Sequence, residues 1–144
     1  MDTLASLPLL FQPGTQWRYS MSTDVCGYLV ELISGMPFAD YMQENICNQL
    51  NMSDTSFMIP ADKQDRFSEL YSHDEDGNLI PLEAGTFRIR DYTSSTPSPS
   101  GGAGLLSTMP DYVNLCIMLL NKGHFNGQQI LGQKTVEFMM CNHV

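Results

Sequence analysis

Apolar residues recur at helical spacing in two neighbouring segments near the start of the chain. The first predicted helix begins after Ser20 or Ser22, either of which can act as the cap, and it ends at Gly35. Its apolar face is formed by Val25, Leu29, Leu32 and Ile33. The second begins at Pro37, whose fixed φ suits a first helical turn, and its apolar face is formed by Phe38, Tyr41, Met42 and Ile46. Because only three residues connect them, the two helices are expected to form a compact pair.

The middle of the chain carries short apolar runs separated by turn-forming residues, a pattern typical of strands. Residues 57–59, with the sequence Phe-Met-Ile, are predicted to form a short edge strand. Residues 67–71 and 79–82 flank an acidic turn at 74–78, whose Asp-Gly pair can take positive φ. We therefore expect a β-hairpin in this part of the chain.

The segment that follows is predicted to be a loop and then a helix. Residues 93–104 are rich in Ser, Thr, Pro and Gly, which favour turns over regular hydrogen-bonded ladders. Thr108 is expected to cap a helix with Pro110 in its first turn and Asp111 near the positive end of the helix dipole. One apolar face of this helix is formed by Val113, Ile117 and Leu120. Gly123 is expected to end it.

A turn and one more amphipathic helix complete the pattern. The Asn-Gly pair at 126–127 predicts a turn, and Ile130 and Leu131 then lead into a helix with Val136 and either Met139 or Met140 facing inward. The inventory is dominated by helices, with two to four short strands, so the predicted fold class is α+β, mainly helical. At 144 residues the chain has the length of one domain.

Composition and charge exclude two classes of partner. Seven Lys and Arg residues stand against sixteen Asp and Glu, and the basic residues are dispersed along the chain. Binding to nucleic acid depends on clustered cations that release counterions, so no nucleic-acid partner is expected. No apolar stretch is long enough to span a membrane, so no membrane association is expected either. The acidity is interpreted as a contribution to solubility.

The four cysteines predict neither disulfides nor a metal site. They are Cys26, Cys47, Cys116 and Cys141, with no Cys-x-x-Cys pair. Most lie in apolar helical patterns, so they are interpreted as free thiols of the core. Cys141 and His143 are the only close pair of metal-ligand types, too few for a site, and we expect no metal and no cofactor. Free thiols, and a first segment without the basic residues of a signal peptide, favour a cytoplasmic location.

Two further segments contain residues that ligand sites use, and both are interpreted as loops. Gly101, Gly102, Ala103 and Gly104 lack the strand, lysine and spacing of a phosphate-binding loop, and loop flexibility explains them better. The acidic residues 74–76 offer fewer oxygen ligands than a calcium loop needs, so a solvated turn is expected there.

Several motifs together resemble a known family. Residues 11–20, Phe-Gln-Pro-Gly-Thr-Gln-Trp-Arg-Tyr-Ser, resemble the segment that carries the catalytic tyrosine in class C β-lactamases and family VIII carboxylesterases. Residues 50–57 resemble the family's Pro-Leu-Gly-Met-x-Asp-Thr-x-Phe motif, and residues 100–108 its glycine-rich segment. These matches occur in the family's order and cover nearly the whole chain. The sequence is therefore similar to serine hydrolases of the β-lactamase and penicillin-binding-protein-like superfamily.

The resemblance implies a fold in which a helical subdomain lies beside an α/β subdomain, and residues 1–144 correspond mostly to the helical part. The family's nucleophile lies in a Ser-x-x-Lys motif, yet no serine here has lysine three residues later. Lys134-Thr135 is followed by Val136, so it is not the family's Lys-Thr-Gly strand. We expect a partial domain that lacks the nucleophile-bearing N-terminal part and the C-terminal sheet strands.

The resemblance also assigns the candidate site residues. Tyr19 corresponds to the catalytic tyrosine, which relays protons to and from the serine. A phenol in water loses its proton near pH 10, so this role needs a neighbouring cation, and the adjacent Arg18 is expected to point away. Met21 stands where β-lactamases have Asn and cannot donate a hydrogen bond to a lactam amide, so ester or amide hydrolysis is favoured. Trp17 is expected to form core or pocket wall. Without the resemblance, Tyr19 would be interpreted as an aromatic packed beside Trp17.

Three functional hypotheses follow. The first is a piece of a serine hydrolase that acts on a small ester or amide through an acyl-enzyme and is inactive by itself. The second is a non-catalytic binding or assembly domain that forms homo-oligomers through exposed apolar surface. The third is that another chain supplies the missing parts and rebuilds the site.

Overall fold

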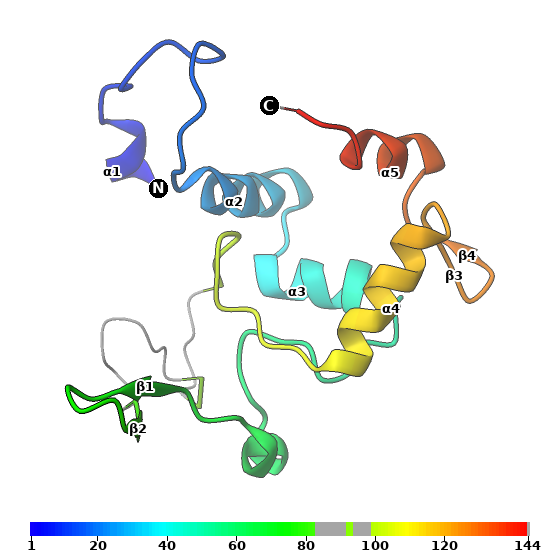
Figure 1. Ribbon diagram of the computed structural model, residues 1–144. Coiled ribbons are helices and arrows are strands. Elements are labelled where there is room, and N and C mark those ends of the chain that lie inside the picture. Colours follow the sequence, from blue (N-terminus) through cyan, green and yellow to red (C-terminus); the bar gives the residue numbers. More distant parts are fainter. Residues whose placement is uncertain (83–91, 94–98, 144) are drawn as a thin grey trace.

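The computed structural model describes residues 1–82, 92–93 and 99–143, and helices dominate it (Figure 1). The helices are α1 (Asp2–Ala5), α2 (Ser22–Ser34), α3 (Phe38–Met42), α4 (Met109–Leu120) and α5 (Gln133–Met139). A π-helical turn (Gln43–Cys47) continues α3, and a 3₁₀ helix spans Ala61–Arg66. The strands are β1 (Tyr71–His73), β2 (Leu79–Pro81), β3 (His124–Phe125) and β4 (Gln128–Gln129). The predicted α+β, mainly helical class is confirmed. Within the described residues, no helix combines the length and hydropathy needed to cross a bilayer.

The first predicted helix is present as α2, and its two ends differ in how well the sequence predicted them. Gly35 ends the helix with φ 70°, and its N–H donates to the carbonyl of Glu31, as expected of a left-handed cap. The predicted serine cap is wrong, because Met21 holds the cap position and no side chain caps the helix. Ser20 and Ser22 bond to each other instead, with 2.5 Å between their hydroxyl oxygens.

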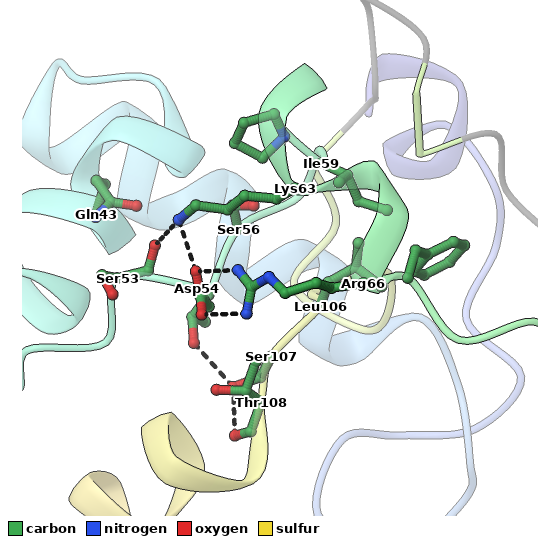
Figure 2. Close-up of a pocket in the computed structure, with 13 residues that line it drawn as sticks. Gln43, Ser53, Asp54, Ser56, Ile59, Lys63, Arg66, Leu106, Ser107 and Thr108 are labelled. Atoms are coloured by element: carbon green, nitrogen blue, oxygen red, sulfur yellow. Dashed lines mark hydrogen bonds and ion pairs between the residues drawn. The ribbon is translucent and has the colours of Figure 1, made fainter.

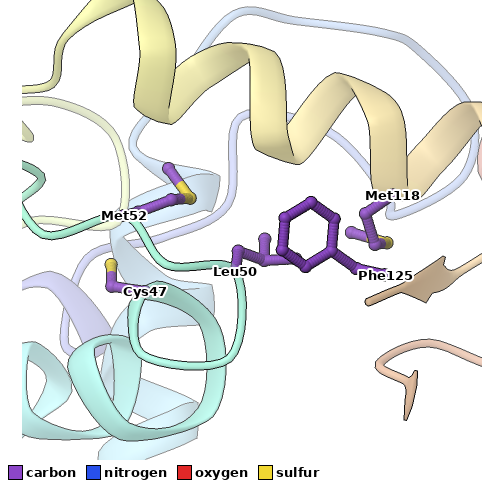
Figure 3. Packing of buried hydrophobic residues seen from close by; sticks show 5 residues of the cluster. All are labelled: Cys47, Leu50, Met52, Met118 and Phe125. Atoms are coloured by element: carbon purple, nitrogen blue, oxygen red, sulfur yellow. The ribbon is translucent and has the colours of Figure 1, made fainter. Parts of the chain in front are cut away.

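A small core joins the π-helical turn, the segment that follows it, α4 and β3. Its buried residues are Cys47, Leu50, Met52, Met118 and Phe125. In Figure 3, Leu50 lies between Met118 and Phe125 on one side and Cys47 and Met52 on the other. Leu50 is 0% exposed, and the side-chain amide of Asn114 on α4 donates to its carbonyl at 2.9 Å. Full burial of a leucine contributes about 2 kcal/mol, so this cluster is the stable centre of the described chain.

Helix α4 begins as predicted but packs with a different face. The Thr108 hydroxyl accepts from the backbone N–H of Asp111 at 3.4 Å, which confirms the cap, and Gly123 follows the helix with φ 92°. The buried side chains are Asp111 and Met118, with Leu115 and Leu119 packed beside the core. The face predicted from apolar spacing remains exposed: Val113, Ile117 and Leu120. Hydrophobic periodicity located the helix but could not tell which of two apolar faces this chain covers.

The expected edge strand at residues 57–59 is not formed. Phe57 and Ile59 are buried, but the only ladder pairing here is an isolated antiparallel bridge between Ser56 and Leu106 among the described residues. The Ile59 N–H makes one further backbone bond, to the carbonyl of Tyr92 at 2.9 Å, and Pro60 then leads directly into the 3₁₀ helix, so no regular ladder develops.

Both predicted turns are present. Strands β1 and β2 pair antiparallel around Gly77, which has φ 83°, so the hairpin is confirmed with shorter strands than expected. The Asp74 carboxylate accepts from the backbone N–H groups of Asp76 and Asn78 at 3.0 and 2.8 Å. The Asn78 side chain also donates to it and lowers the pKa of Asp74, so this acidic segment is a self-bonded turn. The turn at residues 126–127 joins β3 and β4 with positive φ at both positions.

The prediction of which side chains are buried is only partly correct near the C-terminus and at the cysteines. Val136 on α5 is 3% exposed, as predicted, but Met139 and Met140 are 52% and 62% exposed and do not face inward. All four cysteines are free thiols, yet only Cys47 is buried and Cys116 is half-buried, whereas the other two, Cys26 and Cys141, are exposed. The described residues do not pack around all sides of these helices, so some of the apolar side chains stay exposed.

Candidate active site

Tyr19 lies in the irregular segment just before α2, at the rim of an open pocket. Its side chain is 87% exposed. The pocket has a volume of about 520 Å³ and is lined by Tyr19, Ser20, Met21, Thr23, Asp24, Ser100, Gly102 and Ala103. The structure thus brings the tyrosine segment together with the glycine-rich segment, which lies about 80 residues later in the sequence.

The glycine-rich segment is fixed against the first turns of α2. Ser100 donates its hydroxyl hydrogen to the Asp24 carboxylate, and its oxygen accepts from the N–H groups of Gly102 and Ala103, each at 3.1 Å. A side chain at Gly101 would collide with the carbonyl oxygen of Thr23. Loop flexibility is therefore the wrong explanation for glycine at position 101, because the backbone approaches the helix too closely for any Cβ.

Among the described residues the pocket is lined by no cation, and both serines that line it, Ser20 and Ser100, are already hydrogen-bonded. The Ser100 hydroxyl donates to Asp24 and accepts from two backbone N–H groups, so its hydrogen-bonding capacity is already occupied within the loop and α2. No lysine or arginine is among the lining residues. Across residues 1–82, 92–93 and 99–143, the Tyr19 hydroxyl has no hydrogen-bond partner. Tyr19 is accessible, but the groups that a phenol needs for proton relay are not beside it.

The two other predicted site residues differ in their surroundings. Met21 lines the Tyr19 pocket and also a neighbouring apolar groove of about 680 Å³ that the N-terminal segment forms with the start of α2. Trp17 is 73% exposed and lines neither of these two spaces. Only Met21 is therefore placed together with Tyr19.

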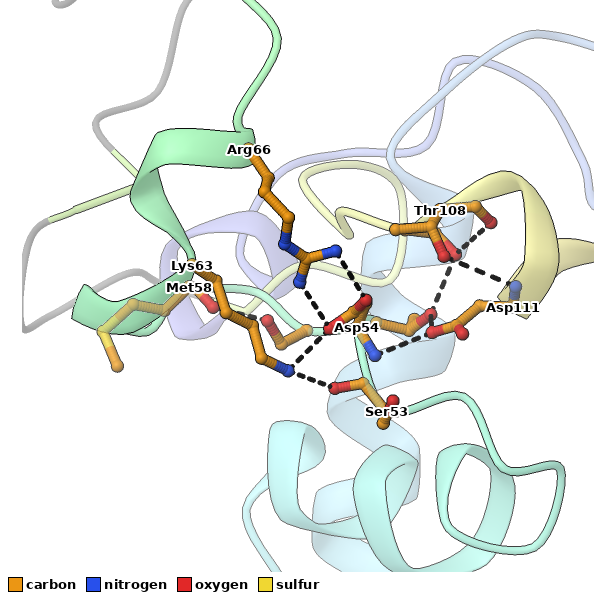
Figure 4. A network of polar contacts seen from close by, with 10 residues as sticks. Ser53, Asp54, Met58, Lys63, Arg66, Thr108 and Asp111 are labelled. Atoms are coloured by element: carbon orange, nitrogen blue, oxygen red, sulfur yellow. Dashed lines mark hydrogen bonds and ion pairs between the residues drawn. The ribbon is translucent and has the colours of Figure 1, made fainter.

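A second polar cluster, which the sequence did not single out as a site, centres on Asp54 (Figure 4). Lys63 bonds one carboxylate oxygen at 2.6 Å, and Arg66 bonds both oxygens at 2.9 and 3.0 Å. The hydrogen bonds from Arg66, then those from Lys63, hold the pKa of Asp54 well below its usual range. Lys63 also donates to the Ser53 carbonyl at 2.9 Å, so the 3₁₀ helix is tied to the turn that follows α3.

Asp111 extends this cluster into the interior. Its carboxylate, on a residue only 5% exposed, accepts from the backbone N–H of Asp54 and from the hydroxyl of Thr55, both at 2.8 Å. Thr55 is 2% exposed and shares a further 2.8 Å hydrogen bond with Ser107. Burial first, and the Asp111 charge second, raise the pKa of the neighbouring Cys47 thiol. Asp111 therefore connects the turn after α3 to the first turn of α4 by hydrogen bonds.

The pocket beside this cluster has a volume of about 220 Å³ (Figure 2). Its two cations, Lys63 and Arg66, already bond Asp54, so neither charge is free for an anionic ligand. These contacts indicate that Lys63 and Arg66 hold the 3₁₀ helix against the turn at Ser53 and Asp54, and they do not indicate a ligand-binding site. The signal in the sequence was the spacing of Lys63 and Arg66 by three residues, downstream of the Asp-Thr pair in the family motif.

No group of three or more His, Cys, Asp or Glu side chains that could hold a metal ion exists in the described part of the chain. Cys141 and His143, the only candidates from the sequence, bond backbone carbonyls instead. The Cys141 thiol donates to Glu137 at 3.3 Å, and the His143 ring lies 2.7 Å from the Phe138 oxygen.

The chain is similar to known proteins in both sequence and fold. A family model described as Beta-lactamase matches residues 1–141. Protein Rv1367c of Mycobacterium tuberculosis is 34% identical over an alignment of 146 positions that covers 100% of this chain and 35% of that protein. Lovastatin esterase of Penicillium rubens is 28% identical over an alignment of 149 positions that again covers 100% of this chain and 35% of the relative. Unliganded simvastatin synthase (LovD) from Aspergillus terreus, a solved structure, matches with a TM-score of 0.77 and 28% identity, over 93% of this chain and 32% of that one.

The chain spans about a third of the length of the curated relatives it matches. The resemblance drawn from the tyrosine segment, the Asp-Thr motif and the glycine-rich segment is confirmed, as is the β-lactamase/transpeptidase-like fold of which this is the helical part. The chain belongs to the beta-lactamase family.

Proposed function

We propose that these residues form the tyrosine-bearing part of a serine hydrolase or acyltransferase that works through an acyl-enzyme, and that they are inactive alone. The proposal depends on one observation: Tyr19 stands exposed at a pocket rim, with neither a free serine nor a cation beside it among the described residues. Relatives named as an esterase and a synthase support this reaction class. The whole enzyme's nucleophile and lysine then lie outside these 144 residues.

In the proposed reaction, a serine attacks the carbonyl of a small ester or amide, and the leaving group departs as the acyl-enzyme forms. Tyr19 takes the serine proton and passes it to the leaving group, which requires an ammonium beside the phenol to stabilise the phenolate. Met21, which lines the Tyr19 pocket, contributes apolar surface for the substrate. Methionine cannot donate a hydrogen bond to a lactam amide, which favours ester or amide hydrolysis over penicillin chemistry.

The test is a chimera in which this chain replaces the segment of lovastatin esterase that aligns with it. Turnover of p-nitrophenyl acetate is measured for the intact relative, the chimera and the isolated chain. We expect activity in the chimera and none above background in the isolated chain. Tyr19→Phe should lower kcat of the chimera by about 10²- to 10⁴-fold, the usual contribution of a positioned proton-transfer group.

A matched control is Tyr112→Phe, which removes the same hydroxyl from an exposed tyrosine on α4 and should leave kcat unchanged. Turnover by the isolated chain at ordinary enzyme rates, abolished by Tyr19→Phe, would overturn the proposed inactivity. An active chimera that does not respond to Tyr19→Phe would remove Tyr19 from the mechanism.

A second candidate function is a non-catalytic assembly domain. It is favoured by the large exposed side chains on α2, α4 and α5, among them Ile33 at 85% and Leu120 at 82%. Exposed apolar surface of this kind drives association. Light scattering distinguishes the two: a stable homo-oligomer of the isolated chain supports assembly, and a monomer at high concentration counts against it.

A further inference from the structure

Helix α2 is amphipathic in the reverse of the usual sense. The side that packs against the rest of the chain carries polar and small residues: Asp24, Gly27 and Glu31. Asp24 bonds Ser100, Gly27 lies against the backbone of Gly101, and Glu31 accepts from the backbone N–H of Phe38 at 2.8 Å. These positions follow one another at helical spacing, so this is a single inward face.

The opposite side of the helix carries apolar residues that face solvent. We call it the outward face of α2, formed by Cys26, Leu29, Leu32 and Ile33. Leu29, Leu32 and Ile33 are 46%, 61% and 85% exposed, and Cys26 is exposed as well. At 3.6 residues per turn the four side chains lie within an arc of about 120°. A 13-residue helix with an apolar stripe this wide normally places it against a core.

Given the function proposed above, we infer that the outward face of α2 is the docking surface for the remaining, nucleophile-bearing part of the β-lactamase fold. The chain spans 35% of the relatives that align with all of it, so about two-thirds of the fold is available to cover the helix. Tyr19 lies only three residues before α2. A partner seated on this face is therefore brought close to the phenol that it must serve.

A second copy of the chain fits the outward face less well. The chain carries a formal net charge of −9, so two copies repel one another. A dimer would also cover α2 without supplying the serine and ammonium groups that the site lacks.

The experiment uses Cys26 as a reporter, because it lies on the outward face and its thiol is exposed in the isolated chain. A thiol reagent is applied to the isolated chain and to the lovastatin esterase chimera, and labelled residues are mapped by mass spectrometry. Docking predicts that Cys26 reacts in the isolated chain and loses this reaction in the chimera. A chimera that folds and leaves Cys26 equally reactive would overturn the inference.

The second measurement is the effect of Ile33→Glu on thermal unfolding. Ile33 is 85% exposed, so the substitution should leave the isolated chain unchanged, whereas in the chimera it buries a charge and should lower Tm by several degrees. Leu79→Glu is the matched control, at a 66% exposed position on β2, which lies well away from α2 in Figure 1, and it should change neither. An equal Tm for the Ile33→Glu and parent chimeras contradicts docking.

The remaining outcomes separate the docking surface from the proposed function. Protected Cys26 without ester turnover keeps the docking surface and removes the proposed activity. Ester turnover by a chimera in which Cys26 stays reactive keeps the proposed activity and removes the docking surface. An isolated chain that dimerises, and that Ile33→Glu returns to monomer, identifies a second copy as the occupant. An insoluble chimera beside a soluble intact relative also counts against docking, because the inference requires matching surfaces.

Discussion

Replacing Asp111 with alanine tests whether the buried carboxylate organises the described chain. The change removes the acceptor of two 2.8 Å hydrogen bonds, from the backbone N–H of Asp54 and from the hydroxyl of Thr55. Hydrogen bonds to a charged acceptor contribute about 1.5–3 kcal/mol each, and Thr55 retains its bond to Ser107, so we expect a loss of about 3 kcal/mol. For a chain of this size the urea midpoint should then fall by roughly 1–2 M, measured by circular dichroism.

Two variants separate the hydrogen bonds from the loss of charge. Asp111→Asn keeps one side-chain oxygen as an acceptor and should cost less than half as much as Asp111→Ala. Asp65→Ala removes one negative charge from an exposed position and should change the free energy of unfolding by at most about 0.5 kcal/mol. If Asp111→Ala unfolds at the parent midpoint, the carboxylate does not connect the turn after α3 to α4, and the reasoning is refuted.

Three further outcomes are expected. Gly101→Ala should cost about 1–3 kcal/mol in urea unfolding because its Cβ meets helix backbone. The same change at Gly132, where a Cβ would make only an ordinary van der Waals contact with Thr135, should cost at most about 1 kcal/mol. Lys63 and Arg66 lower the pKa of Asp54 in the folded chain, so their ion pairs stabilise the fold fully above the unfolded-state pKa of about 4. This stabilisation is lost as the pH falls from there through the folded-state pKa. Asp54→Asn should remove that part of the acid sensitivity, measured as urea midpoints over a pH series. Burial raises the pKa of Cys47, so a thiol reagent should modify the exposed Cys141 much faster.

Local signals predicted the elements whose ends are fixed by nearby residues. Gly35 ends α2, Thr108 caps α4, and Gly77 closes the hairpin, and in each case the deciding contact lies within four residues. The serine cap of α2 failed because two neighbouring hydroxyls bond each other, a choice that residue type alone does not determine.

Long-range contacts decided what the sequence could not predict. The Asp111 carboxylate meets Thr55 across 56 positions, and Ser100 meets Asp24 across 76, so no local pattern shows either pair. Apolar periodicity also marks a face without saying what covers it, which is why the stripes of α2 and α4 were located but not recognised as exposed. The placement of Tyr19 with Met21 and the glycine-rich segment needed the folded chain.

The close approach of Gly101 to α2 couples two parts of the pocket that are far apart in sequence. The loop backbone rests directly on the carbonyl of Thr23, and Tyr19 lies four residues earlier on the same stretch of chain. A side chain at position 101 would therefore have to displace the start of the helix, and Tyr19 with it. Under the proposed function, substitutions in this loop are therefore expected to change the substrate range of a full-length relative by moving the tyrosine without replacing it.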